Sequence, residues 1–112
     1  MDELLRLSKR PTVVFAASDD MAVGALNCAL DRGLRVPQDI SIMGFDGSNI
    51  TDIVRPSITS MQQPIYEMGQ VSLENLHRLI IHAKNKPRAD IMLQHQLVVR
   101  ESCKIIPSSA SV

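Results

Sequence analysis

The sequence predicts an α/β domain built around a parallel β-sheet, and three segments near the start of the chain carry this prediction. Residues 12–17 (TVVFAA) form a continuous apolar run, which is typical of a strand covered on both faces of a parallel sheet. Residues 18–33 follow with apolar side chains at helical spacing, and residues 40–45 (ISIMGF) form a second apolar run. The connection between the two runs has the length of a parallel crossover, so we expect a strand–helix–strand unit.

The predicted helix has a clear start and a clear stop. Ser18 can accept a hydrogen bond from a backbone N–H group of the first turn, and Asp19 and Asp20 place negative charge at the positive end of the helix dipole. Gly33 is the expected stop, because glycine readily adopts the left-handed conformation that ends helices. The apolar face of this helix is formed by Met21, Ala22, Ala25, Leu26, Ala29 and Leu30.

The segments on either side of this unit have shorter patterns. Residues 1–8 have the apolar spacing of the last two turns of a helix, which suggests that the sequence is a fragment of a longer protein. Residues 47–56 are polar and rich in turn-forming residues, so we expect a loop in which Ile53 and Val54 either pack locally or face another chain. Residues 58–61 are expected to add a third strand, parallel to the first two.

The second half of the chain predicts a long helix and a sheet edge. Pro64 suits the first helical position, and the pattern continues to about residue 83. Gly69 within this helix suggests a close approach to another backbone. Residues 91–99 alternate loosely and are expected to form one or two edge strands, before a frayed tail over 107–112. The expected buried stripe of the helix consists of Ile65, Met68, Ser72, Leu76, Leu79 and Ile80.

Composition excludes several classes of protein. The chain has 112 residues with 12 basic and 12 acidic side chains, so it is electrically balanced. Neutrality argues against direct binding of nucleic acid by this part, because contacts with phosphates dominate that affinity. No run approaches the roughly 18 apolar residues of a membrane span, and residues 1–9 lack the apolar core of a signal peptide. We therefore expect no membrane association.

The cysteines and histidines predict neither a metal site nor a catalytic one. Cys28 and Cys103 lack metal or redox spacing, and Cys28 falls on the apolar helix face, where a small buried side chain is expected rather than a disulfide. The three histidines, at 77, 82 and 95, show no ligand spacing with cysteine or carboxylate. No serine or cysteine nucleophile has a supporting motif. We expect no cofactor and no enzyme activity.

Polar side chains follow each of the three predicted strands. Ser18 and Asp19 follow the first, Asp46 the second, and Gln62 and Gln63 the third. In open parallel α/β sheets, ligands bind beyond the carboxyl ends of the strands. These ends carry hydroxyl, carboxylate and amide groups, without lysine, arginine or a glycine-rich phosphate loop. The pattern therefore favours a neutral polyol over a phosphate.

Four ordered motifs resemble the LacI/GalR family of sugar-responsive bacterial repressors: TVVFAASDDMAVGAL, DRGLRVPQDISIMGFD, RPSITSMQQPIYEMGQ and LVVRES. The resemblance covers residues 4–102, with the motifs in the order and at the spacing found in the family. It implies a periplasmic-binding-protein-like (type I), Rossmann-like parallel sheet belonging to the C-terminal lobe of an effector-binding domain. In the family, a helix-turn-helix headpiece that binds operator DNA normally precedes this domain, and neither it nor most of the first lobe is present in the sequence.

The resemblance also implies how the chain is divided. Residues 1–63 correspond to the C-terminal lobe with its strand–helix–strand core, and residues 64–87 to a crossover helix that normally packs on the missing N-terminal lobe. Residues 88–106 correspond to the returning edge strands, and residues 107–112 to a tail. In this chain alone, the crossover helix would either fold back on the sheet or be covered by a second copy.

Individual site residues can be carried over from the family motifs. Asp46 matches the carboxylate that accepts hydrogen bonds from the effector. Ser18 occupies a position that is usually asparagine, and its shorter side chain would reach less far toward the effector. Asp19 matches the acidic residue of the same turn, where a helix cap is expected rather than a ligand contact. Gln62 or Gln63 matches the ligand amide of the crossover segment, and we favour Gln62.

The implied function is sugar sensing by a transcriptional regulator of carbohydrate genes. An effector, such as the pentose ribose, would close the cleft between two lobes and change operator binding through the absent headpiece. The resemblance further implies a cytoplasmic homodimer with Val23 and Val54 at its interface. A secreted sugar-binding protein of a transport system is the alternative, because it shares this fold. A flavodoxin-like enzyme domain would need a phosphate loop that the sequence lacks.

Overall fold

The computed structural model describes residues 1–81 and 90–105 of the 112-residue chain. It contains two compact units. The first consists of residues 1–62 together with the described residues from 97 onward, and the second consists of the described residues between 63 and 96.

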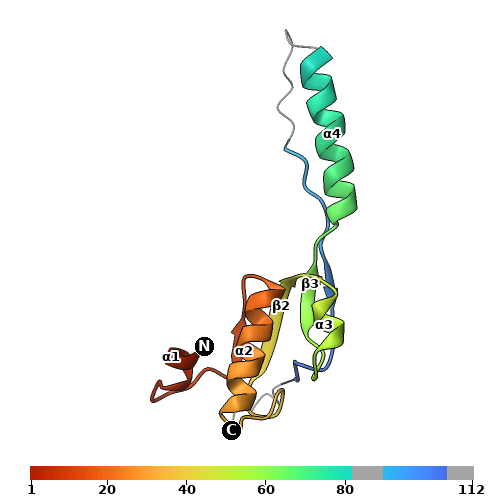
Figure 1. Cartoon of the computed structure of the whole chain (residues 1–112). Helices are drawn as coiled ribbons and strands as arrows, with labels where there is room; N and C mark the ends of the chain where they lie inside the picture. The colour runs from red at the N-terminus through yellow and green to blue at the C-terminus, as the bar shows by residue number, and fades with distance from the viewer. Residues whose placement is uncertain (82–89, 106–112) are drawn as a thin grey trace, which may run out of the picture. The chain divides into compact units, whose positions relative to one another are not determined.

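A four-stranded sheet in the order β1-β2-β3-β4 organises the first unit (Figure 1). Its strands are β1 (Val13–Phe15), β2 (Ser41–Asp46), β3 (Thr59–Gln62) and β4 (Gln96–Val98). β2 pairs in parallel with both β1 and β3. The predicted parallel arrangement of the first three strands is therefore confirmed, and their carboxyl ends lie at one edge of the sheet.

Helix α2 (Asp19–Asp31) connects β1 to β2 and lies against the sheet (Figure 1). Ser18 caps it as predicted, because its Oγ accepts a hydrogen bond from the backbone N–H of Met21 at 3.2 Å. The helix ends at Asp31 with Arg32 as its C-cap, and Gly33 follows with φ +73°, which is the predicted stop. The buried core between helix and sheet includes Ala22, Leu26, Ala29, Ile40, Ile42 and Ile58.

The approach of α2 to the sheet is unusually close at Gly44. A Cβ atom at this position would lie 2.3 Å from Oδ1 of Asp19 and 3.2 Å from the Cβ of Ala22. Only glycine leaves the room that the first turns of α2 occupy over β2. Gly44 therefore determines how deeply Asp19 is buried.

The first unit also contains two short helices, of which only the first was predicted. Helix α1 (Asp2–Leu5) agrees with the helical pattern at the start of the sequence, and its Leu5 is buried in the core. Helix α3 (Ile50–Ile53) lies inside the segment predicted to be a loop, so that part of the prediction is wrong. Its single turn is too short for a hydrophobic period to show in sequence.

One local hydrogen bond and two from a distant segment stabilise α3 instead. The buried Thr51 donates its hydroxyl to the backbone oxygen of Ser48 at 2.7 Å. The guanidinium of Arg100 donates to Asp52 at 2.6 Å and to the backbone oxygen of Ile58 at 2.9 Å. These contacts link α3 to the neighbouring β3, beside which Figure 1 shows it.

The prediction that β1 is covered on both faces is wrong. Val13 is 47% exposed and Phe15 is 59% exposed. The side chain of Phe15 contacts the ring of Phe45 edge to face, with centroids 6.4 Å apart, and this partial contact leaves most of its surface open. Val14, between Val13 and Phe15, is half-buried and packs against the core, so the described residues cover one face of β1 and leave the face of Val13 and Phe15 accessible.

Helix α4 (Ile65–Ile81) dominates the second unit, and it confirms the predicted long helix. None of its residues is buried, so the predicted buried stripe is wrong within this chain. The physical reason is that no described residue of the second unit covers the apolar side chains, and a Cβ at Gly69 would meet no atom within 4 Å. The expectations for His82 and for the tail over 107–112 lie outside the described residues.

The segment after β4 returns to the amino ends of β2 and β3, where Ser102 joins the two strands. Its buried Oγ donates to the backbone oxygen of Ile42 at 2.5 Å and accepts from the backbone N–H of Thr59 at 2.9 Å. Its backbone oxygen accepts from Ile42 N–H at 3.0 Å, and its own N–H donates to the backbone oxygen of Ser57 at 2.9 Å. We call these four bonds the serine clamp.

Two carboxylates accompany the serine clamp. Glu101 accepts from the backbone N–H of Ser57 at 2.8 Å and from its hydroxyl at 3.0 Å, and these bonds lower the pKa of the Glu101 carboxyl. In the turn before β2, Asp39 accepts from the Arg35 guanidinium at 2.8 and 3.0 Å and from the Arg35 backbone N–H at 2.7 Å. This bonding lowers the pKa of the Asp39 carboxyl.

Candidate functional site

Asp46 and Gln62 lie side by side at the carboxyl ends of two neighbouring strands. They are direct partners in the parallel register of β2 and β3. Asp46 is half-buried and Gln62 is exposed. The structure thus brings together a carboxylate and an amide from segments 16 residues apart, at the sheet edge where ligands of such folds bind.

The backbone at the end of β2 has an uncommon conformation. Asp46 has φ +116° and Gly47 has φ +77°. A side chain other than glycine is rarely found in this region, because its Cβ crowds the backbone. A Cβ on Gly47 would lie 2.6 Å from the Cγ of Gln62 and 2.7 Å from its Cα and Cβ. The chain therefore turns sharply after Asp46 and passes directly over Gln62.

Asp19 has a different place from the one expected of a helix cap. Ser18 caps α2, while the Asp19 carboxylate is 1% exposed and accepts three hydrogen bonds from other segments. Its Oδ2 accepts from the backbone N–H of Ser48 at 2.6 Å and from the Ser48 hydroxyl at 2.9 Å. Its Oδ1 accepts from the hydroxyl of Ser60 at 2.6 Å. The cap interpretation is wrong, because the carboxylate bonds to the loop after β2 and to β3.

Ser60 extends this network toward the turn. Its side chain is fully buried, and its Oγ accepts from the backbone N–H of Gly47 at 3.3 Å while it donates to Asp19. We call Asp19, Ser48 and Ser60 the aspartate hub. Sequence reasoning missed Ser48 and Ser60 as site residues. The available signal was two hydroxyl residues, Thr59 and Ser60, inside the third strand segment and a serine directly after Gly47.

The remaining predicted site residues are placed as follows. Ser18 is half-buried, and its Oγ is engaged by Met21 N–H. Gln63 belongs to the second unit. Val23 and Val54 are both half-buried and pack against the core of the first unit.

The chemistry of this sheet edge is that of hydrogen bonding to neutral groups. It offers the Asp46 carboxylate and the Gln62 amide, and neither residues 44–49 nor residues 58–64 include a lysine or arginine. Across residues 1–81 and 90–105, no group of three or more His, Cys, Asp or Glu side chains could hold a metal ion. In the same ranges, no helix is long and apolar enough to cross a membrane.

Comparison with known families gives one match across most of the chain. Residues 1–103 match the model of the periplasmic binding protein-like domain. Among curated relatives, HTH-type transcriptional regulator MalR of Clostridium butyricum is 44% identical over 104 residues, which are 92% of this chain and 30% of MalR. Catabolite control protein A of Priestia megaterium is 38% identical over 107 residues, 93% of this chain and 31% of that protein. The chain therefore spans about a third of the length of these relatives.

Solved structures give the same result. A LacI family transcriptional regulator from Enterococcus faecium with bound ribose superposes with a TM-score of 0.79 at 31% identity, over 91% of this chain and 37% of that one. The lac repressor dimer bound to operator and an anti-inducer superposes with a TM-score of 0.75 at 32% identity, over 83% of this chain and 32% of the repressor. At these identities the relationship extends beyond the fold.

Proposed function

The chain belongs to the LacI/GalR family of transcriptional regulators, as part of their periplasmic-binding-protein-like effector-binding domain, and we propose that it binds a neutral sugar and dimerises. The observation that carries the proposal is the pairing of Asp46 with Gln62 at the carboxyl edge of the sheet. A carboxylate accepts hydrogen bonds from sugar hydroxyls, and an amide both donates and accepts. Signalling would follow from a difference in sugar affinity between two arrangements of the regulator.

The proposed effector is a pentose such as ribose. The Enterococcus faecium relative was solved with ribose bound, and the absence of lysine and arginine from the two strand-end segments disfavours a phosphorylated sugar. We place Asp46 and Gln62 in direct contact with sugar hydroxyls, and we keep Ser18 and Gln63 as further ligand candidates. The operator DNA would be bound by a helix-turn-helix headpiece, as the type name of the MalR relative suggests, and the regulator would act in the cytoplasm.

Calorimetric titration of the gene's full-length product with D-ribose tests this assignment. We expect Asp46→Ala to weaken binding at least about tenfold, because a hydrogen bond to a charged group contributes about 1.5 to 3 kcal/mol. Asp20→Ala provides a matched control, since Asp20 is an exposed aspartate near the same sheet edge. Unchanged affinity in Asp46→Ala would remove this carboxylate from the sugar site.

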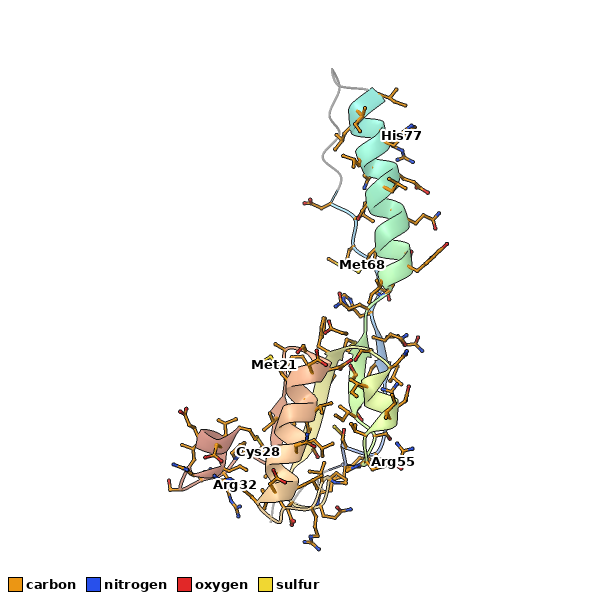
Figure 2. The ribbon with its side chains drawn as sticks, viewed as in Figure 1. Met21, Cys28, Arg32, Arg55, Met68 and His77 are labelled. Carbon is orange, nitrogen blue, oxygen red and sulfur yellow. The ribbon has the colours of Figure 1, made fainter. Side chains whose placement is uncertain are left out.

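We also propose that a second copy of the protein binds over α2 and α3. The solved lac repressor is a dimer, and the predicted interface residues, Val23 on α2 and Val54 directly after α3, are half-buried. Their neighbours Met21 and Ile53 are 61% and 69% exposed and extend the apolar surface; Figure 2 labels Met21 near the start of α2. Sedimentation of an Ile53→Glu variant should show monomers at concentrations where the unmodified protein is dimeric. A dimer that persists in this variant would place the interface elsewhere.

A further inference from the structure

We propose that Asp19 is a positioning residue of the sugar site, whose buried carboxylate fixes Asp46 beside Gln62. This inference rests on the proposed function, because it concerns the same site. It assigns Asp19 neither to the cap of α2 nor to direct contact with the sugar. Asp19 would act on the ligand only through the backbone that it holds.

The burial of Asp19 excludes a direct contact. The residue is 1% exposed, and three donors occupy its two oxygens at 2.6, 2.9 and 2.6 Å. A carboxylate removed from water is stable only when hydrogen bonds replace its hydration. The three donors belong to Ser48 and Ser60, and their bonds are strong because the acceptor is a carboxylate. The buried carboxylate has almost no surface left for a ligand.

The donors lie on both sides of the proposed sugar contacts. Ser48 follows Asp46 by two residues, and Ser60 precedes Gln62 by two residues. Ser60 also accepts from the backbone N–H of Gly47 at 3.3 Å. One carboxylate is thus connected to the segment after β2 and to the end of β3, and these are the segments that present Asp46 and Gln62.

The conformation of Asp46 requires this support. Its φ of +116° is unfavourable for a residue with a Cβ and persists only where the surroundings enforce it. The bonds from Gly47 and Ser48 into the aspartate hub hold the two peptides that follow Asp46. When the hub is weakened, the turn can relax, and the Asp46 carboxylate then moves relative to Gln62.

A purely structural role makes a different prediction. A residue that only stabilises the fold changes the folded fraction, and its effect adds to that of a distant substitution. A residue that acts through Asp46 loses its effect once the Asp46 carboxylate is gone. A double-mutant cycle between Asp19 and Asp46 therefore separates the two roles.

The experiment uses the gene's full-length product and titrates it with D-ribose, and with D-glucose in parallel. Asp19→Asn keeps the shape of the side chain but turns an amide donor toward the Ser48 N–H group or the Ser60 hydroxyl. We expect it to weaken binding about tenfold, and to change binding less than about twofold when Asp46→Asn is already present. Asp20→Asn is the control, because it removes the same charge from the exposed neighbour in the same helical turn, and we expect no change.

A milder variant and a ligand-free measurement complete the test. Ser48→Ala removes only the hydroxyl bond of an exposed residue, and we expect it to weaken binding about threefold. Amide hydrogen exchange at Ser48 should accelerate in Asp19→Asn, while exchange at Thr59 in the serine clamp stays unchanged.

Each contrary result has a distinct meaning. Unchanged sugar affinity in both Asp19→Asn and Ser48→Ala overturns the inference and leaves the proposed function intact. A tenfold loss that persists in the Asp46→Asn background also overturns it, because Asp19 would then act through general stability. An unmodified protein that binds neither sugar overturns the proposed function, and the inference with it, before any variant is made.

Discussion

The two edges of the sheet are closed by buried polar side chains of different kinds. At the amino edge the neutral Ser102 bonds to backbone groups of β2, β3 and the segment before β3. At the carboxyl edge the buried carboxylate of Asp19 bonds to two serines and one backbone N–H group. Both networks are satisfied, since no buried side-chain nitrogen or oxygen among the described residues lacks a partner.

The two networks differ in a way that indicates which of them has a role besides stabilising the fold. The serine clamp joins strands with neutral groups in ordinary backbone conformations, as a purely structural connection requires. The carboxyl edge combines a buried charge, an aspartate at φ +116° and a glycine packed directly on Gln62. Such features reduce stability and persist where surrounding contacts enforce a special geometry, so they are concentrated at functional sites. Four predictions test this contrast.

Gly44→Ala should have the largest effect. The added Cβ would lie 2.3 Å from Oδ1 of Asp19, so α2 must shift and the aspartate hub must break. We expect the free energy of unfolding to fall by about 3 kcal/mol or more, because overpacking adds to lost charged hydrogen bonds. Urea unfolding measures this.

The control for this substitution is Gly24→Ala. Gly24 lies within α2, and an added Cβ would meet no atom within 4 Å. Alanine should therefore raise the free energy of unfolding by up to about 1 kcal/mol, since it favours helix over glycine. Equal losses in the two variants would contradict the close approach at Gly44.

Gly47→Ala should follow, with a loss of about 2 to 3 kcal/mol in the free energy of unfolding. The new side chain meets both a positive φ and the atoms of Gln62. Gly33→Ala is the matched control, because Gly33 has nearly the same φ, +73°, and no atom within 4 Å of the added Cβ. The difference between the two variants isolates the contact with Gln62, and we expect D-ribose affinity to fall only in Gly47→Ala.

Ser102→Ala should destabilise the protein without changing its affinity for the sugar. The substitution leaves the buried N–H of Thr59 without its acceptor, so we expect a loss of about 1 to 3 kcal/mol in the free energy of unfolding. D-ribose affinity of the folded protein should stay within about twofold of that of the unmodified protein. A tenfold change in affinity would show that the two edges are coupled and would remove the distinction between them.

The smallest of the four effects should be the loss of stability in acid, through Asp39 and Glu101 near the amino ends of the strands. The pKa values of Asp39 and Glu101 are lowered in the folded chain, so both bind protons less readily than in the unfolded chain. Their contribution is therefore complete above the ordinary carboxyl pKa of about 4 and is lost as the pH falls through the lowered folded values. Both groups are solvent-exposed, and salt should reduce the effect further. Urea unfolding at pH 3 and pH 7 should differ less in Asp39→Asn and in Glu101→Gln than in the unmodified protein.

The parts of the fold that depend on local signals could be predicted from sequence. The apolar runs, the Ser18 cap and the Gly33 stop predict β1, α2 and β2, and the strand-end rule predicts that Asp46 and Gln62 lie at the same end of the sheet. Their direct pairing is known from the register in the structure. The role of Asp19, after the end of β1, could not be predicted. Asp19 is indistinguishable in sequence from a capping residue, because its burial depends on the close approach at Gly44 and on hydroxyls of Ser48 and Ser60 from later segments.

Features that depend on distant segments could not be predicted. In the serine clamp, Ser102 is separated in sequence from its partners Thr59 and Ile42 by 43 and 60 positions. The exposure of Phe15 depends on what else lies on that face of the sheet, and the exposure of α4 depends on what else packs on the helix. Apolar periodicity shows that a side chain can be buried, and it does not say which element covers it.

The distance of Ser102 from its partners has a consequence for how the protein is made. A ribosome adds roughly 5 to 20 residues per second, so several seconds separate the synthesis of β3 from the arrival of the LVVRES motif in the tunnel. During that interval the N–H of Thr59 and the carbonyl of Ile42 await the hydroxyl that will join them. Nascent β2 and β3 can pair in this time, but they lack the two hydrogen bonds of the Ser102 hydroxyl. The serine clamp can therefore form only after Ser102 has been synthesised and has left the ribosome.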